Sequence, residues 1–196
     1  MTEKEILTRK FMLVKMYEAR ISTEEKPIIG TQALHTCIGV ILYSEEKKKA
    51  IVAHVAPGQK DIIDKLVKLI VENNLAETTI KYKIISGYHE EHYNTKKYLE
   101  KNLNFFTEIE ETDNAIETDE KYESRQFAFD ASTGQFVTDQ VLFGQDYSTI
   151  NPEKSEHDEP TTKRRKSWKK KKMLLNTTYY VINWKMLLEQ AGKIGK

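Results

Sequence analysis

Residues 31–54 read TQALHTCIGVILYSEEKKKAIVAH and contain Cys37, the only cysteine among 196 residues. The segment 31–43 is dense in β-branched and apolar residues, and the segment 49–55 repeats that pattern. Between them, residues 44–48 are short and charged, as a hairpin loop must be. The pattern therefore predicts two strands that pair antiparallel around a tight loop.

The predicted hairpin places the cysteine beside a histidine. With the loop centred near residue 46, Cys37 lies about nine positions before the centre and His54 about eight after it, which is within cross-strand reach. An imidazole can take the proton of a neighbouring thiol, and the thiolate is the nucleophile. The pair predicts covalent catalysis on a carbonyl carbon.

The spacing Thr-x5-Cys-x16-His, formed here by Thr31, Cys37 and His54, resembles a known family. It is similar to the chemoreceptor glutamine deamidases (CheD) and the deamidase toxins that share their fold. Where that family has Leu-Gly-Ser-Cys or Leu-Ser-Gly-Cys, this chain has Leu34-His35-Thr36-Cys37. The resemblance covers about residues 11–142 and implies a glutamine side chain as the substrate.

The resemblance also implies roles for the site residues. Cys37 would attack the carboxamide carbon, and His54 would move the proton. Thr31 lies an even number of residues from Cys37, so on one continuous strand both would project to the same face; by resemblance its hydroxyl orients His54. Backbone N–H groups, including that of Cys37, would hold the oxyanion. We expect His35 and Thr36 to contact the substrate at the rim.

A structural role for Cys37 stays open beside the catalytic one. A cysteine in an apolar strand is often an inert core residue. Both faces of the strand predicted at 31–43 look buried, because apolar or small residues occupy each of them: Cys37, Gly39 and Ile41 on one, Ile38, Val40 and Leu42 on the other. A buried cysteine without a base nearby would leave a catalytically silent relative that only binds a partner.

The rest of the chain predicts a single α+β domain, with a twisted, mainly antiparallel sheet or sandwich flanked by two or three helices and followed by a C-terminal extension. Residues 11–21 fit a helix or a strand, and the resemblance favours a strand. Further along we expect a helix from the acid Asp61 to Asn73, strands at 78–86 and 107–111, a helix at 93–106, a surface loop at 112–122, and a hairpin of 125–130 with 135–142.

Composition changes sharply after residue 143 and divides the chain into three parts. We expect a deamidase domain at 1–143, a charged linker or long loop at 144–172, and a segment at 173–196 that docks on the domain or on a partner. The linker carries a basic patch of Lys163, Arg164, Arg165, Lys166, Lys169, Lys170, Lys171 and Lys172, interrupted by Ser167 and Trp168. It fits an electrostatic partner, nucleic acid, an anionic surface, a nuclear-localisation signal or a solvated tail.

Several classes of site are excluded by the sequence. A single cysteine cannot form an internal disulfide or a multi-cysteine metal site. His89 and His92 lack the four-residue spacing of a zinc helix, so we expect a solvated helix start there, and neither a metal nor a cofactor. No segment approaches the roughly 18 apolar residues of a membrane span, and no secretory signal opens the chain. We expect a cytoplasmic protein where it is synthesised, with delivery into a host cell as one option.

These observations predict a cysteine-dependent protein glutamine deamidase that acts on a target protein carrying a reactive glutamine. The altered residues before Cys37 and the basic patch favour a divergent member, with a toxin or effector among the candidates. Three alternatives stay open: the silent binding module, a nucleic-acid binder driven by residues 163–172, and transglutamination through the same thioester with an amine acceptor.

Overall fold

The computed structural model describes residues 9–89, 92–110, 116–120, 123–137 and 142. These residues form an α+β fold of two helices and two mixed β-sheets, in which most strand pairs are antiparallel. The predicted fold class is therefore confirmed at this level. The predicted linker and C-terminal segment, including the basic patch, lie outside the described residues.

The predicted hairpin forms the centre of the first sheet, here called sheet B. Sheet B has the strand order β2-β5-β4-β6-β7, with β2 at Ala19–Ile21, β4 at Ile38–Ser44, β5 at Lys49–Val55, β6 at Ile80–Ser86 and β7 at Thr107–Glu108. Within the β4–β5 hairpin Gly39 pairs with His54. This register is two residues from the predicted one, so it keeps the same residues on the same face.

The second sheet, sheet A, has the strand order β1-β3-β9-β10, and β8 pairs with β9 on a side branch. Its strands are β1 at Phe11–Leu13, β3 at Ile28–Leu34, β8 at Glu117–Asp119, β9 at Ser124–Asp130 and β10 at Gln135–Val137. The predicted β9–β10 hairpin is present. The prediction of a loop throughout 112–122 is wrong at β8, because backbone pairing with β9, supported by a 2.8 Å hydrogen bond from Gln126 to Glu117, overrides the acidic composition.

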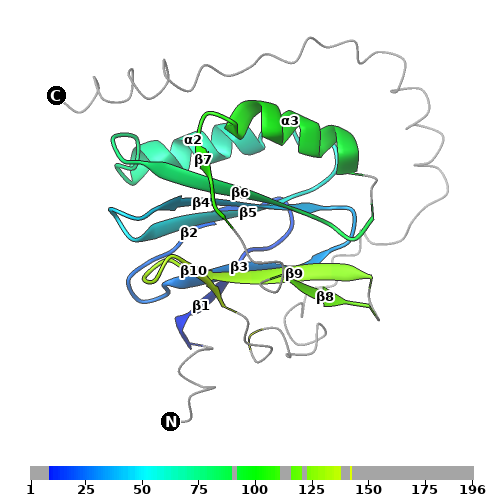
Figure 1. Cartoon of the computed structure of the whole chain (residues 1–196), viewed down its shortest axis with the longest axis horizontal. Coiled ribbons are helices and arrows are strands. Elements are labelled where there is room, and N and C mark those ends of the chain that lie inside the picture. The colour runs from blue at the N-terminus through cyan, green and yellow to red at the C-terminus, as the bar shows by residue number, and fades with distance from the viewer. Residues whose placement is uncertain (1–8, 90–91, 111–115, 121–122, 138–141, 143–196) are drawn as a thin grey trace, which may run out of the picture. The chain divides into compact units, whose positions relative to one another are not determined.

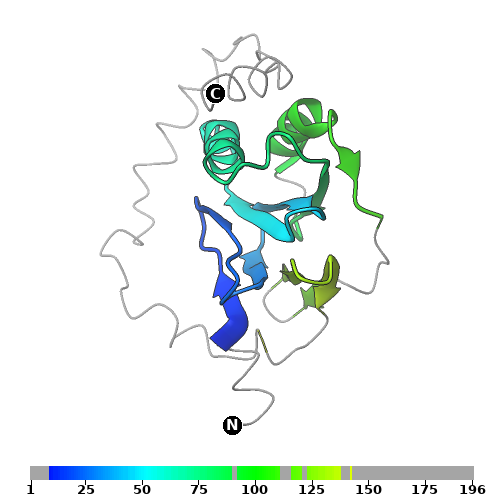
Figure 2. The same ribbon diagram turned by 90° about the vertical axis from the view of Figure 1, so that its left-hand side faces the viewer.

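Two helices cover one face of sheet B, as Figure 1 shows. Helix α2 spans Ile62–Glu72, with Asp61 as its N-cap and Asn73 as its C-cap, and helix α3 spans Tyr93–Leu103. Both were predicted from apolar residues at helical spacing. Figure 2 shows the resulting layers of helices, sheet B and sheet A. One core cluster lies between the helices and sheet B, and a second lies between the two sheets.

The prediction of one strand from Thr31 to Tyr43 is wrong. Strand β3 ends at Leu34 in sheet A, and β4 begins at Ile38 in sheet B, so the chain crosses between sheets at residues 35–37. The crossing follows a register shift after Thr31 and a left-handed residue, Ala33, with φ of 59°. Thr31 and Cys37 are therefore not on the same strand.

A second crossing occurs where the sequence pattern was ambiguous. Residues 11–21 form strands, as the resemblance favoured, but they are two short strands, β1 in sheet A and β2 in sheet B. The turn between them contains Tyr17, whose φ of 68° is left-handed. Both crossings lie near one end of sheet B, because Tyr17 N–H donates to the carbonyl of His54 at 2.9 Å.

Gly39 lets the two sheets approach at the centre of their shared core. A Cβ atom at this position would lie 2.3 Å from a ring carbon of Phe127 on β9. Phe127 is buried, so its ring has little room to move. The phenyl ring thus fills the space that any side chain at position 39 would need.

We expect Gly39→Ala to lower the free energy of unfolding by about 1–3 kcal/mol, through overpacking against the ring. Phe127→Leu removes the clashing ring atoms, so the double variant should lose less than the sum of the two single losses. Urea unfolding of the four proteins measures this coupling. Additive losses would contradict the contact.

Candidate catalytic site

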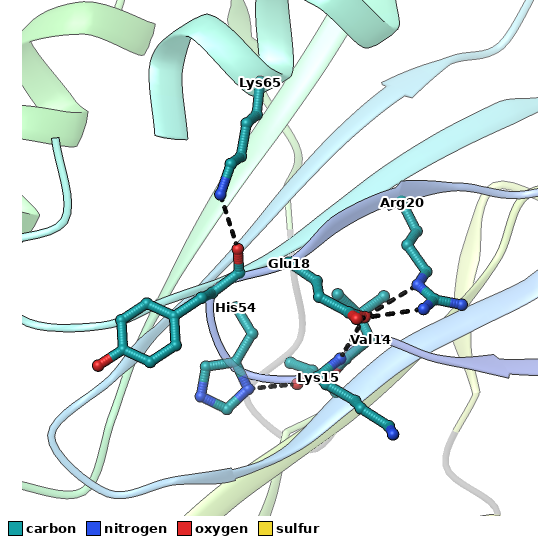
Figure 3. A network of polar contacts seen from close by, with 8 residues as sticks. Val14, Lys15, Glu18, Arg20, His54 and Lys65 are labelled. Atoms are coloured by element: carbon teal, nitrogen blue, oxygen red, sulfur yellow. Dashed lines mark hydrogen bonds and ion pairs between the residues drawn. The ribbon is translucent and has the colours of Figure 1, made fainter. Parts of the chain in front are cut away.

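The candidate site lies where the two crossings meet strand β5. His54 is on β5 in sheet B, and Thr31 is on β3 in sheet A. Thr31 Oγ1 lies 2.7 Å from His54 Nδ1 and 2.8 Å from the carbonyl oxygen of Val14. Figure 3 shows His54 and Val14 in this network. A single buried hydroxyl therefore connects the two sheets and the first crossing.

The two contacts of Thr31 fix the tautomer of His54. A hydroxyl carries one proton, and the Val14 carbonyl can only accept, so Thr31 donates to Val14. Nδ1 of His54 must then be the donor in its contact with the Thr31 oxygen. This leaves Nε2 as the ring nitrogen with a free lone pair, which is the form that a general base requires.

His54 is buried and has a strongly perturbed pKa. His54 is 4% exposed, and within the described part of the chain its Nε2 atom has no hydrogen-bond partner. Burial lowers the pKa of His54 from its ordinary value of 6.5 to about 4. The imidazole is therefore neutral at pH 7. Because buried polar atoms are nearly always bonded, this open nitrogen marks a candidate functional site.

Cys37 lies directly before β4, two residues from the cross-strand partner of His54. It is 6% exposed and belongs to the core cluster between the sheets. Its Sγ lies 3.8 Å from Sδ of Met16, and no hydrogen bond to His54 exists among the described residues. Burial raises the pKa of the Cys37 thiol, more than the hydrogen bond with Thr36 lowers it. The resting cysteine is a neutral thiol.

The residues predicted at the rim lie beside the cysteine on the second crossing. His35 is exposed, and Thr36 is half-buried. The ring of His35 stacks on that of His89, with centroids 5.8 Å apart and planes 7° apart, and His89 Nε2 lies 2.9 Å from Glu123. Residues 87–89 follow β6 and pair with the crossing, since His89 N–H donates to the His35 carbonyl at 3.0 Å.

Sequence reasoning missed both Met16 and His89 as neighbours of the site. Nothing in the alternation of residues 11–21 marks Met16, because its position follows from the turn between β1 and β2. For His89 the clue was its histidine-rich segment, which we expected to be a solvated helix start. A helix does begin there, with His92 as N-cap, but His92 is buried, so the expectation of solvation is wrong for that residue.

We expect Thr31→Val to lower the free energy of unfolding by about 2–3 kcal/mol, because it leaves the buried Nδ1–H of His54 and the Val14 carbonyl without their shared partner. Thr31→Ser keeps the hydroxyl and should lose clearly less. Chemical unfolding monitored by circular dichroism compares the three proteins. Equal losses for valine and serine would show that the hydroxyl does not matter.

The lowered pKa of His54 also predicts how stability depends on pH. Between pH 6.5 and about 4 the unfolded chain binds a proton at this histidine that the folded chain does not. Stability therefore falls as pH falls through this window, by about 3 kcal/mol from this group alone. His54→Gln should flatten that part of the profile. Unfolding measured at several pH values gives the slopes, and identical slopes for wild type and His54→Gln would refute the assignment.

The described residues also bear on metal binding and membrane spanning. Among the described residues, no group of three or more His, Cys, Asp or Glu side chains is placed to hold a metal ion. None of the helices in that part of the chain combines the length and apolarity needed to cross a membrane. Comparison of the chain with models of known protein families and with curated proteins finds no match.

Proposed function

We propose that the protein is a CheD-like, cysteine-dependent glutamine deamidase that acts on a target protein. The observation that carries this proposal is the open Nε2 of His54, held in the base-competent tautomer by Thr31, on the strand next to Cys37. Together with the Thr-x5-Cys-x16-His spacing, it supplies a nucleophile, a base and an orienting group. Assignment to a toxin or effector, and to a host-cell target, belongs to the same proposal.

In the proposed reaction the substrate amide displaces Met16 from the thiol, and Cys37 Sγ turns toward His54. Nε2 takes the thiol proton while sulfur bonds to the carboxamide carbon, and the carbonyl electron pair moves to oxygen. Collapse of this intermediate breaks the C–N bond, and the imidazolium gives its proton to the leaving ammonia. Water, deprotonated by Nε2, then cleaves the thioester to give glutamate and restores the thiol.

The neutral resting state determines which form of cysteine catalysis is proposed. Burial favours the neutral thiol and the neutral imidazole, so the pair is not a preformed thiolate–imidazolium pair. Proton transfer must therefore accompany attack, with His54 as a general base. The oxyanion would be held by the backbone N–H of Cys37 and a neighbouring donor.

A second candidate is a catalytically silent binding module of the same fold. It is favoured by the burial of Cys37 and by the contact of its sulfur with Met16 rather than with His54. Under this proposal Cys37 is a core residue, and the surface near His35 contacts a partner without chemistry. Glutamine conversion separates the two candidates.

We expect the wild-type protein to add about one dalton per converted glutamine to a susceptible target protein and to release ammonia, whereas Cys37→Ser does neither. Intact-mass analysis of a lysate or of candidate targets, combined with an ammonia assay, provides the measurement. Thr31→Ser should retain most activity, and Thr31→Val should lose at least about tenfold, because the tautomer is no longer fixed. A primary amine incorporated in place of water would point to transglutamination. Conversion that persists in Cys37→Ser would rule out this nucleophile, and no conversion by a folded wild type would favour the silent module.

A further inference from the structure

Met16 is an exposed apolar side chain that lies against a buried thiol. It is 51% exposed, whereas Cys37 is 6% exposed, and their sulfur atoms are 3.8 Å apart. Exposed thioethers are flexible and adapt to the ligands that they contact. The side chain of Met16 therefore lies between solvent and at least one side of the nucleophile.

The backbone that carries Met16 is held on both sides. Before it, Val14 N–H donates to the Gly30 carbonyl at 2.8 Å, and the Val14 carbonyl accepts from Thr31. After it, the Tyr17 carbonyl accepts a hydrogen bond of 3.0 Å from Lys65 Nζ. Figure 3 labels Lys65 and draws this hydrogen bond as a dashed line. A side chain with three rotatable bonds on a fixed backbone can move without the strands moving.

A second observation points to a ligand at this place. Nε2 of His54 is buried and has no partner among the described residues, so a group that reaches the site can bond to it. The next residue along the crossing, Tyr17, donates its N–H to the carbonyl of the same histidine. The segment that covers the thiol is thus continuous with the segment that contacts the base.

Two further large apolar side chains are exposed at this end of sheet B. Tyr17 is exposed beside Met16, and Tyr88 is exposed two residues after β6, whose last residue Ser86 pairs with Ile38. Because Ile38 directly follows Cys37, Tyr88 lies at the same end of sheet B as the thiol. Exposed apolar side chains at the end of the sheet that carries a buried polar base suit a ligand with an aliphatic stem and a polar head.

We propose that Met16 is a specificity-determining residue that controls entry to Cys37: its side chain moves off the thiol to admit narrow, unbranched side chains and excludes bulky groups. Glutamine, with two methylene groups before its carboxamide, fits this requirement, and naming glutamine rests on the proposed deamidase function. The control of entry itself concerns only the reactivity of the thiol.

Alkylation of Cys37 tests the proposal without a known substrate. The probes are iodoacetamide, which is narrow and carries a carboxamide, and N-ethylmaleimide, which is bulky; each rate is divided by the rate for the urea-unfolded chain. We expect Met16→Ala to raise the normalised N-ethylmaleimide rate by about tenfold and the iodoacetamide rate by less, while Met16→Leu stays near wild type. Because the chain has one cysteine, intact mass reports its modification directly.

Phe105→Ala provides the matched control. Phe105 is similarly exposed but lies two residues before β7. Strand β7 pairs with the start of β6, at the opposite end of sheet B from Cys37. An unchanged N-ethylmaleimide rate in Met16→Ala, or an equal increase in Phe105→Ala, would overturn the proposal. If Met16→Ala does not fold, Met16→Phe provides the test, since a larger, stiffer side chain should slow both probes.

The outcomes separate this inference from the proposed function. If the alkylation rates change as expected but no protein converts glutamine, the control of entry stands and the deamidase proposal fails. If the wild type converts glutamine while Met16→Ala alkylates like the wild type, the deamidase stands and the role of Met16 fails.

Discussion

The hydroxyl of Thr31 makes the buried polar contact on which the candidate site depends. It lies between the carbonyl of Val14 and Nδ1 of His54, so it connects the first crossing, sheet A and sheet B at one point. A hydroxyl is small enough to fit in the core between the sheets and has both functions needed there, one proton to donate and lone pairs to accept. A carboxylate at this position would accept from Nδ1 as well, but it could not donate to the Val14 carbonyl, and its charge would be costly to bury.

Burial shifts the pKa values of the two candidate catalytic groups, Cys37 and His54, in opposite directions. It raises the pKa of the Cys37 thiol and lowers that of the His54 imidazole, and both shifts favour the uncharged form. A neutral, buried thiol is also protected from stray oxidation, because the thiolate is the reactive species. The arrangement therefore suits a nucleophile that is generated only when a substrate is in place.

Local sequence patterns were sufficient for the elements that depend on local physics. The hairpin of β4 and β5 and the helices α2 and α3 follow from alternation, apolar spacing and end signals, and all were predicted. The crossing between Leu34 and Ile38 was not, because apolar residues continue through it and nothing in them distinguishes a strand in one sheet from its continuation in another. The left-handed backbone at Ala33 is equally hidden, since alanine rarely adopts it.

The proximity of Thr31 to His54 shows how a correct contact can be expected for a wrong reason. Parity along one strand placed the threonine beside the site, but in the structure it approaches from the opposite sheet. The spacing between Thr31 and His54 is the number of residues that the chain needs to leave sheet A, cross to sheet B, and run along β4 and back along β5. This spacing therefore describes a path through both sheets, whereas parity describes a single strand.

Nε2 of His54, which has no hydrogen-bond partner in the part of the chain that the structure describes, bears on the choice between an active and a silent protein. A buried polar atom without a partner costs roughly 1–3 kcal/mol, and an apolar residue in its place would remove that cost. The histidine is also kept in a single tautomer by a hydroxyl that itself donates to the Val14 carbonyl, which is more order than core packing requires. Proteins keep such local violations of good packing mainly at sites with a function. The energetic balance at Nε2 thus favours a site that binds a group at this nitrogen over an inert core.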